Sequence, residues 1–226
     1  VLTTSYKDEL KKFFLGFVKE SKISIVANGI AIELFPRVID RSDRVIANKI
    51  LKVGMAARFS NTKRQDLLIE MLRIIKQSNP EFNIQLSLAG DGPELEKAKC
   101  TVENENLTPF ITFEGLLNEV ELAKWYGALD IYAHASSGET LSISLLQAMS
   151  CGLPIIASDV DGISNLLHQE EDYGLCIEND PLCFVDAVMN VSQNYQEAQS
   201  VGMKASIIVK KNYSNRGMLE SYLSLL

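Results

Sequence analysis

Apolar, β-branched runs alternate with amphipathic stretches along most of the chain, and this alternation constrains the fold more than any other feature. The runs that predict strands cover residues 23–27, 51–57, 84–89, 110–113, 131–134, 155–158 and 174–177. Helical patterns lie between them at residues 64–77, 93–105, 119–128, 141–150 and 182–194. Strict alternation of strand and helix predicts βαβ units, whose strands form a parallel sheet covered on both faces. The predicted fold is therefore α/β, with a doubly wound, Rossmann-like parallel sheet.

Composition argues against several classes of function. The 226 residues carry 22 Lys and Arg against 29 Asp and Glu, a net charge of −7, and no basic stretch is interleaved with aromatic residues. We therefore expect no nucleic-acid partner. The four cysteines form no CxxC pair and there are two histidines, so we expect no disulfide framework, no metal site and no cofactor. No apolar run approaches the roughly 20 residues that span a bilayer, so we expect no transmembrane segment.

Ligands of doubly wound sheets bind outside the carboxyl ends of the strands, so residues that directly follow a strand are the candidates. Arg58 follows the strand KVGMAA, and Lys63 lies five residues later, where the next helix begins. A guanidinium and an ammonium beside a helix start suit a pyrophosphate. From the spacing alone, two solvated surface cations are the favoured interpretation, and the feature by itself is a weak signal. Gly90, Asp91, Gly92 and Pro93 predict a tight turn into a helix with proline at its first position, rather than a dinucleotide fingerprint.

Residues 130–162 contain more candidate ligand-binding residues than any other segment. A predicted strand ends at His134, a small-residue loop follows, and Glu139 precedes a helix expected to open near Thr140. Free N–H groups at such a helix start form an anion site. Gln147 lies eight positions after Glu139, roughly 12 Å along a helix that begins at once, a span that suits a diphosphate with polar groups at both ends. His134, on a predicted strand, is more simply a hydrogen-bonded core residue than a catalyst.

Taken in order, several segments resemble the C-terminal domain of the group 1, or family-4, glycosyltransferases of the GT-B fold. They are VANGI, GMAARFSNTK, LAGDGP, ITFEGLL, WYGALDIYAHASSGETLSISLLQAMSCGLPIIAS and DYGLCIEND, and they extend over about residues 21–190. The resemblance implies a retaining transfer of a sugar from a nucleotide-diphosphate donor, which this domain binds without a metal.

The resemblance also implies roles for individual residues. Arg58 and Lys63 match the family's cation pair on the diphosphate, and Glu139 matches the first acidic residue of its paired-glutamate motif, which contacts the donor sugar. These three side chains would carry the catalytic contribution of the domain. Donor binding would fall to the base loop, the next helix start and the second motif position: Gly115, Leu116, Leu117, Thr140, Leu141, Ser142, Ile143 and Gln147.

The sequence departs from the family at positions that matter. Gln147 replaces the second glutamate, which is expected to accept hydrogen bonds from both ribose hydroxyls. An amide offers one acceptor and a donor, so a charge-assisted hydrogen bond becomes a neutral and weaker one. Leu141 and Ser142 replace the usual phenylalanine and glycine, and Ala135 replaces a proline. An altered donor preference is one consequence.

The resemblance further implies a division of the chain. Residues 1–36 are expected to be a remnant of an N-terminal acceptor domain, 37–48 a linker and 49–226 the donor-binding domain. The rest of the acceptor domain would precede Val1, so we expect this chain to bind donor but to transfer little sugar by itself. The parent protein would act on a glycan or lipid acceptor in the cytoplasm, with any membrane contact made through the missing half.

Two other functions stay open at this point. A non-catalytic nucleotide-sugar-binding module would account for Gln147 and Ser142 as marks of lost or altered donor binding. A sugar-nucleotide epimerase would share the two-domain architecture, but we find no counterpart of its catalytic acid and base residues.

Overall fold

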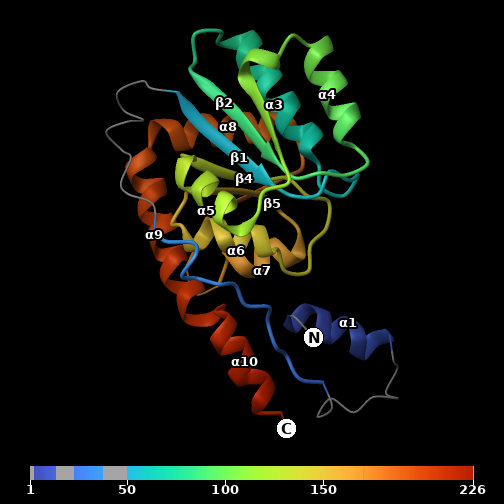
Figure 1. Ribbon diagram of the computed structural model, residues 1–226, viewed down its shortest axis with the longest axis vertical. Coiled ribbons are helices and arrows are strands. Elements are labelled where there is room, and N and C mark those ends of the chain that lie inside the picture. The colour runs from blue at the N-terminus through green and yellow to red at the C-terminus, as the bar shows by residue number, and fades with distance from the viewer. Residues whose placement is uncertain (1–2, 14–22, 38–49, 170, 226) are drawn as a thin grey trace.

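A six-stranded parallel sheet forms the centre of the protein, which we describe from a computed structural model of residues 3–13, 23–37, 50–169 and 171–225 (Figure 1). The strands are β1 (Leu51–Ala56), β2 (Ile84–Ala89), β3 (Ile111–Gly115), β4 (Ile131–His134), β5 (Ile155–Ser158) and β6 (Leu175–Ile177). Their order is β3-β2-β1-β4-β5-β6, with every described pair parallel. This order confirms the predicted doubly wound sheet.

Helices cover both faces of the sheet (Figure 1). One face carries α3 (Gln65–Ser78), α4 (Leu95–Asn104) and α8 (Pro181–Gln193), which bury apolar side chains in one cluster with β1 and β2. The other face carries α5 (Glu119–Ala128), α6 (Ile143–Ser150), α7 (Asp161–Leu167) and α9 (Tyr195–Asn212), which share a second cluster. Because both faces are covered, β4 and β5 are buried along their whole length, which explains their continuous apolar sequences.

The start of α5 shows how local sequence sets a boundary. The side chain of Asn118 accepts hydrogen bonds from the N–H groups of Val120 and Glu121, and Glu121 bonds back to the N–H of Asn118. This reciprocal cap satisfies backbone donors that a helix start would otherwise leave open. The observed helix has the bounds that the sequence predicts, residues 119–128.

Three local predictions were wrong. Residues 23–27 form no strand, because they pair with no strand among the described residues; the nearest pairing is an isolated bridge between Ile30 and Ser214. Helix α4 begins at Leu95 rather than at Pro93, since the N–H of Glu94 bonds to the carbonyl of Phe59 in a preceding turn. Helix α6 begins at Ile143, so its predicted start near Thr140 or Leu141 is two or three residues early.

The segment before the predicted linker packs against the second helical layer. Phe35 is fully buried and meets Tyr126 edge to face, with ring centroids 5.9 Å apart. The Ser150 hydroxyl donates to the carbonyl of Phe35 at 3.0 Å, and the N–H of Ile30 bonds to Tyr213. Residues 30–35 therefore share a core with α5, α6 and α9. The division at residues 36 and 48 stays a prediction, and residues 38–48 lie outside the described part.

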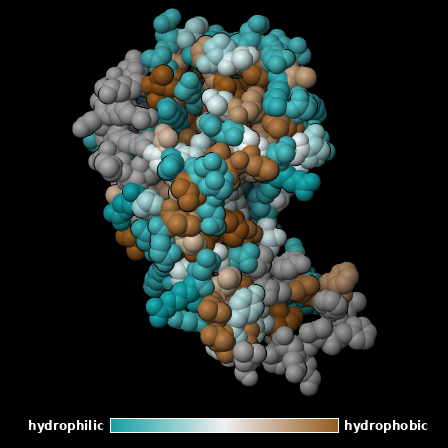
Figure 2. All heavy atoms as spheres, in the orientation of Figure 1, coloured by the Kyte–Doolittle hydropathy of each residue, from teal (hydrophilic) through white to brown (hydrophobic). Residues whose placement is uncertain are grey.

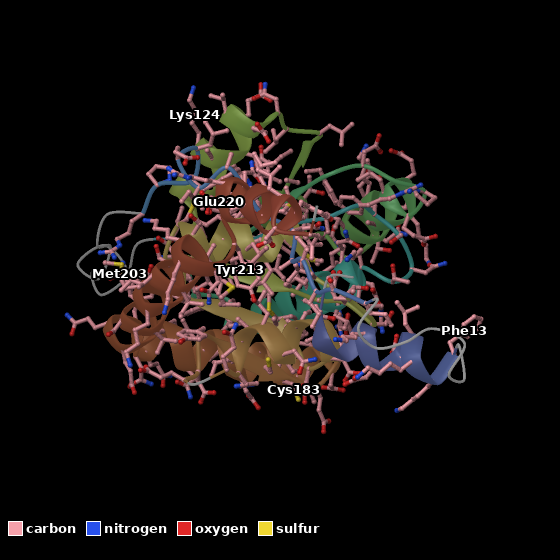
Figure 3. The ribbon with its side chains drawn as sticks, turned by 90° about the horizontal axis from the view of Figure 1, so that it is seen from below. Phe13, Lys124, Cys183, Met203, Tyr213 and Glu220 are labelled. Atoms are coloured by element: carbon pink, nitrogen blue, oxygen red, sulfur yellow. The ribbon has the colours of Figure 1, made fainter. Side chains whose placement is uncertain are left out.

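Two peripheral helices lie beyond the sheet at the end of the molecule where both termini are found (Figure 1). They are α1 (Thr4–Phe13) and α10 (Asn215–Leu223). Phe13, at the far end of α1, points away from the rest of the protein and is 78% exposed (Figure 3). A narrow waist separates this end from the sheet-bearing part (Figure 2). Within the described ranges, no helix combines the length and apolar character needed to cross a membrane.

Candidate functional site

A cavity of about 750 Å³ opens at the carboxyl ends of the strands, where β1 and β4 are neighbours. The strand order reverses its direction between these two strands, and such a switch point is where doubly wound sheets bind ligands. Nine of the predicted site residues line the cavity: Arg58, Lys63, Leu116, Leu117, Glu139, Leu141, Ser142, Ile143 and Gln147. The structure therefore brings together residues that are far apart in the sequence.

Lys63 reaches the cavity because two loops are bonded to each other. The carbonyl of Thr62 accepts from the N–H of Ser137 at 2.8 Å and from the hydroxyl of Ser136 at 3.1 Å. This contact joins the loop after β1 to the loop after β4. The alternative of two unrelated surface cations therefore does not describe Lys63, whose side chain is only 23% exposed.

Arg58 stands at the open side of the same cavity with an exposed side chain. The buried side-chain amide of Gln65 donates to the Arg58 carbonyl at 3.1 Å, and this hydrogen bond fixes the Arg58 backbone. The guanidinium is thus carried on a fixed loop, and its long side chain can turn toward a ligand.

Glu139 lies at the centre of the polar contacts. Its Oε1 atom accepts from the Lys63 ammonium and lies 2.8 Å from Nε2 of His134. Among the described residues, no hydrogen bond reaches the second oxygen, Oε2. The backbone of Glu139 is also fixed, because a Cβ atom added to Gly162 at the start of α7 would lie 2.1 Å from the Glu139 carbonyl oxygen. One carboxylate oxygen is therefore held by the protein and the other is available to a ligand.

The start of α6 forms a further part of the cavity wall. Ser142 is the N-cap residue, and its hydroxyl accepts from the N–H of Leu145 at 3.3 Å. Among the described residues, none accepts a hydrogen bond from the N–H groups of Ile143 and Ser144. These two donors lie at the positive end of the helix dipole, so they can bind an anion. The span predicted between Glu139 and Gln147 assumed a helix that begins at once, and this condition is not met because α6 begins only at Ile143.

The far end of the cavity combines an amide with apolar side chains. Gln147 is 9% exposed, and its Oε1 lies 3.4 Å from the hydroxyl of Tyr126, which also donates to the carbonyl of Ser144 at 2.8 Å. Leu116 and Leu117 form part of the wall beside it, and Leu116 is 78% exposed. An exposed leucine beside a buried amide suits a flat, amphipathic group.

Two predicted donor-binding residues do not line this cavity. Gly115 lies behind it, where its carbonyl accepts from the N–H of Gly90 at 2.7 Å and so links the loops after β2 and β3. Thr140 faces a neighbouring cavity of about 470 Å³, which it shares with Glu139 and Asp161. Both residues support the site only indirectly in this geometry.

Burial and hydrogen bonds set the charges around Glu139. Burial lowers the pKa of His134, and the nearby Lys63 adds to this effect, although Glu139 opposes it. Burial by itself would raise the pKa of Glu139, but hydrogen bonds from His134 and Lys63 outweigh it, and the pKa is lowered. At neutral pH we therefore expect a neutral histidine and an ionised glutamate.

These shifts predict a pH-dependent stability. Both groups bind fewer protons in the folded chain than in the unfolded one, so the free energy of unfolding rises with pH. It should fall as the pH drops below 6.5, the ordinary value for histidine, and fall further below 4.5, the ordinary value for glutamate. Urea unfolding between about pH 8 and about pH 5 measures this slope. The slope below pH 6.5 should be smaller in His134→Gln, and an unchanged slope would contradict the assignment.

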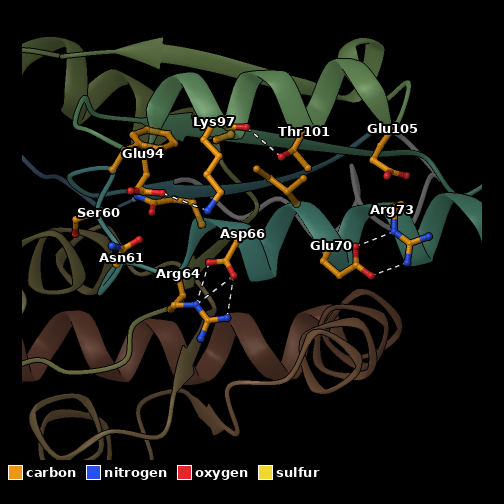
Figure 4. Close-up of a pocket in the computed structure, with 14 residues that line it drawn as sticks. Ser60, Asn61, Arg64, Asp66, Glu70, Arg73, Glu94, Lys97, Thr101 and Glu105 are labelled. Carbon is orange, nitrogen blue, oxygen red and sulfur yellow. Dashed lines mark hydrogen bonds and ion pairs between the residues drawn. The ribbon is translucent and has the colours of Figure 1, made fainter.

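A second groove lies between α3 and α4 (Figure 4). It has a volume of about 220 Å³, and its cations are paired with neighbouring carboxylates. Arg64 bonds to Asp66, Arg73 to Glu70 and Lys97 to Glu94. In the cavity at the switch point Lys63 is also paired, with Glu139, but among the described residues Arg58 forms no ion pair there, so that cavity offers an anion a cation that the second groove lacks.

Sequence reasoning missed the residues that support the site from behind. Tyr126, Tyr132, Thr62 and Gln65 each hold a loop or a side chain of the cavity wall. Their sequence signals are those of ordinary core or loop residues, so no pattern marks them. The turn at Gly90 and Gly92, predicted as structural, also lines the cavity.

The chain is similar in sequence to known proteins. The model of the family described as "Glycosyl transferases group 1" matches residues 48–194. The chain is 21% identical over 190 residues to a D-inositol 3-phosphate glycosyltransferase of Paenarthrobacter aurescens, covering 82% of this chain and 47% of that protein. It is 28% identical over 215 residues to the O-antigen biosynthesis glycosyltransferase WbnH of Escherichia coli, covering 93% and 56%. The chain thus spans about half the length of these relatives.

Solved structures share the fold. A mutant of S. aureus TarM, determined with UDP among its ligands, superposes with a TM-score of 0.82 at 24% identity, covering all of this chain and 43% of TarM. HepE of Anabaena, determined with UDP and glucose, gives a TM-score of 0.77 at 20% identity, covering 95% of this chain and 60% of HepE. These likenesses confirm the predicted fold.

Proposed function

Because the chain belongs to the group 1 glycosyltransferases, we propose that its cavity binds the nucleotide-diphosphate sugar used by a retaining glycosyltransferase. The observation that carries this proposal is the convergence of Arg58, Lys63 and the open N–H groups of α6 on one cavity at the switch point. In the reaction, the bond between the sugar and the diphosphate breaks, and a bond from the sugar to an acceptor oxygen forms.

The diphosphate would lie between the two cations and the start of α6. Arg58 and Lys63 would offset its negative charge, which grows as the nucleoside diphosphate leaves. The N–H groups of Ile143 and Ser144 would donate to phosphate oxygens. To reach the phosphate, the Lys63 ammonium must turn from Glu139, so binding exchanges one ion pair for another.

The two ends of the donor would meet different groups. The sugar hydroxyls would donate to Oε2 of Glu139, the oxygen that no described residue bonds. The ribose would contact the amide of Gln147, and the base would lie against Leu116 and Leu117. No side chain is assigned as a general base, because a donor phosphate oxygen can accept the proton of the acceptor hydroxyl.

The acceptor would be a glycan or a lipid bound by an N-terminal domain. Transfer needs closure of two domains around the donor, so that water is excluded. We therefore expect this chain by itself to bind donor and to transfer little sugar.

Isothermal titration with UDP- and GDP-sugars tests the proposal. UDP-sugars come first, since UDP is the nucleotide in the TarM and HepE structures. We expect micromolar to low-millimolar binding that Arg58→Ala weakens. The rival function is a non-catalytic module that no longer uses this donor class. If none of the UDP- and GDP-sugars bound, the result would favour the non-catalytic module and contradict donor binding.

A further inference from the structure

A buried chain of hydrogen bonds stands behind Glu139. The hydroxyl of Tyr132 lies 3.3 Å from the carbonyl oxygen of Ala56 and 3.2 Å from Nδ1 of His134. The opposite ring nitrogen, Nε2, lies 2.8 Å from Oε1 of Glu139 and 3.4 Å from the hydroxyl of Ser142. His134 and Tyr132 are both fully buried, so neither touches solvent or the cavity directly.

The donors and acceptors along this chain of hydrogen bonds determine the protonation state of the His134 ring. Ionised Glu139 only accepts hydrogen bonds, so Nε2 of His134 must carry a proton. If Nδ1 carried one as well, the ring would be a cation with no exposed surface, next to the positive charge of Lys63. Burial disfavours that form. The ring is therefore neutral, Nε2–H donates to Glu139, and Nδ1 is an acceptor that shares the single Tyr132 hydroxyl proton with the carbonyl oxygen of Ala56.

The contacts of Glu139 show what the ring accomplishes. Two donors, the Lys63 ammonium and His134 Nε2, both reach Oε1. When Lys63 turns to a phosphate, His134 is the remaining described side chain that bonds the carboxylate. Without it, Glu139 would be free to rotate about its side-chain bonds, and Oε2 would lose its fixed direction.

We propose that His134 is a positioning residue, which holds Glu139 so that its free oxygen faces the sugar of the donor. This inference rests on the proposed function, since it assumes that Glu139 contacts a sugar. His134 would affect the sugar part of the donor and leave the diphosphate part to Arg58, Lys63 and the start of α6.

Two amide variants separate the two ring nitrogens. The side-chain nitrogen of His134→Gln can occupy the place of Nε2, so this variant keeps a donor toward Glu139. His134→Asn is shorter, reaches only the place of Nδ1, and loses that donor. His168→Asn is the matched control, because His168 is exposed and bonds to Asp172 at 2.5 Å, away from the cavity.

The test compares each nucleotide with its sugar-bearing form: UDP with UDP-glucose, and GDP with GDP-mannose. His134→Asn should bind the sugar nucleotide about tenfold more weakly, as expected for loss of a hydrogen bond to a charged group, and should bind the plain nucleoside diphosphate as before. His134→Gln should restore most of the loss. Equal weakening of both ligands, or equal behaviour of the Asn and Gln variants, would overturn the proposal.

Nitrogen NMR of the His134 ring in the unliganded chain provides a readout that needs no ligand and no variant. A neutral ring protonated at Nε2 supports the proposal, and one protonated at Nδ1 overturns it. If no nucleotide binds the original chain, the proposed function fails while the ring measurement still decides the state of His134. The two failures are therefore distinguishable.

Discussion

Replacing Lys63 with methionine is expected to weaken the binding of a nucleoside diphosphate by roughly 10- to 100-fold. A hydrogen bond to a charged group contributes about 1.5–3 kcal/mol, and each 1.4 kcal/mol corresponds to about a tenfold change in affinity. Methionine keeps most of the apolar stem, so the change removes mainly the charge. The variant also leaves Glu139 without its cationic partner, which adds a repulsive charge near the phosphate.

Glu139→Gln should affect the binding of UDP and of UDP-glucose differently. The change frees Lys63 from its ion pair and removes a negative charge, so UDP alone should bind more tightly. UDP-glucose should gain less or lose affinity, because the carboxylate would no longer accept from the sugar hydroxyls.

Lys124→Met is the matched control for Lys63→Met, since Lys124 is an exposed residue of α5 that points away from the protein (Figure 3). Equal losses in Lys63→Met and Lys124→Met would contradict the assignment.

Gly90→Ala is expected to lower the free energy of unfolding by about 3 kcal/mol or more. Gly90 has a φ of +132°, a backbone conformation that side-chain-bearing residues rarely adopt, and this strain costs about 1–3 kcal/mol. An added Cβ atom would also lie 2.1 Å from the carbonyl oxygen of Ala57, so the loops after β1 and β2 must separate. Forcing extra atoms into a packed site costs about 1–3 kcal/mol more.

Gly127→Ala is the control for this change. Gly127 lies in α5, and an added Cβ atom would meet no other atom within 4 Å. Alanine should therefore stabilise the protein by about 0.5–1 kcal/mol through its helix propensity. Urea unfolding measures both variants. A Gly90→Ala protein as stable as the original would show that the two loops are not packed together as described.

Strands β1, β4 and β5 were predictable because their apolar runs are buried along nearly their whole length. The bounds of β2, β4 and β5 agree with the sequence patterns, and the parallel order follows from the alternation of strands and helices. Residues 23–27 carry the same kind of run, yet they pair with no neighbouring strand. Composition describes a preference for extended backbone, but a strand also needs a partner, which the local sequence does not specify.

The start of α6 shows a second limit of local patterns. Thr140 and Ser142 are both residue types that cap helices, and the sequence offers no reason to choose between them. The structure uses Ser142, whose buried hydroxyl reaches the N–H of Leu145 and also contacts Ser144. The Ser142 hydroxyl also lies 3.4 Å from Nε2 of His134, and the Tyr126 hydroxyl donates to the carbonyl of Ser144, so this helix start is held by contacts with other elements that a local pattern does not contain.

Single residues of the site were predictable from the sequence, but the contacts between them were not. Arg58 and Lys63 follow from the rule that ligands bind after strand ends. The pairing of Lys63 with Glu139 joins residues 76 positions apart. It depends on the bonds from Ser136 and Ser137 to the carbonyl of Thr62. Such long-range polar contacts leave no periodic signal in a single sequence.

The most direct test of the account is an amide NMR titration of the chain with UDP and with GDP. The account predicts that the largest shifts occur at Ile143 and Ser144, whose N–H groups would meet the diphosphate, with smaller shifts around Arg58 and Leu116. Shifts that appear instead at Glu94 and Thr101, in the groove between α3 and α4, would contradict it. So would the absence of any shift at Ile143 and Ser144 with either nucleotide.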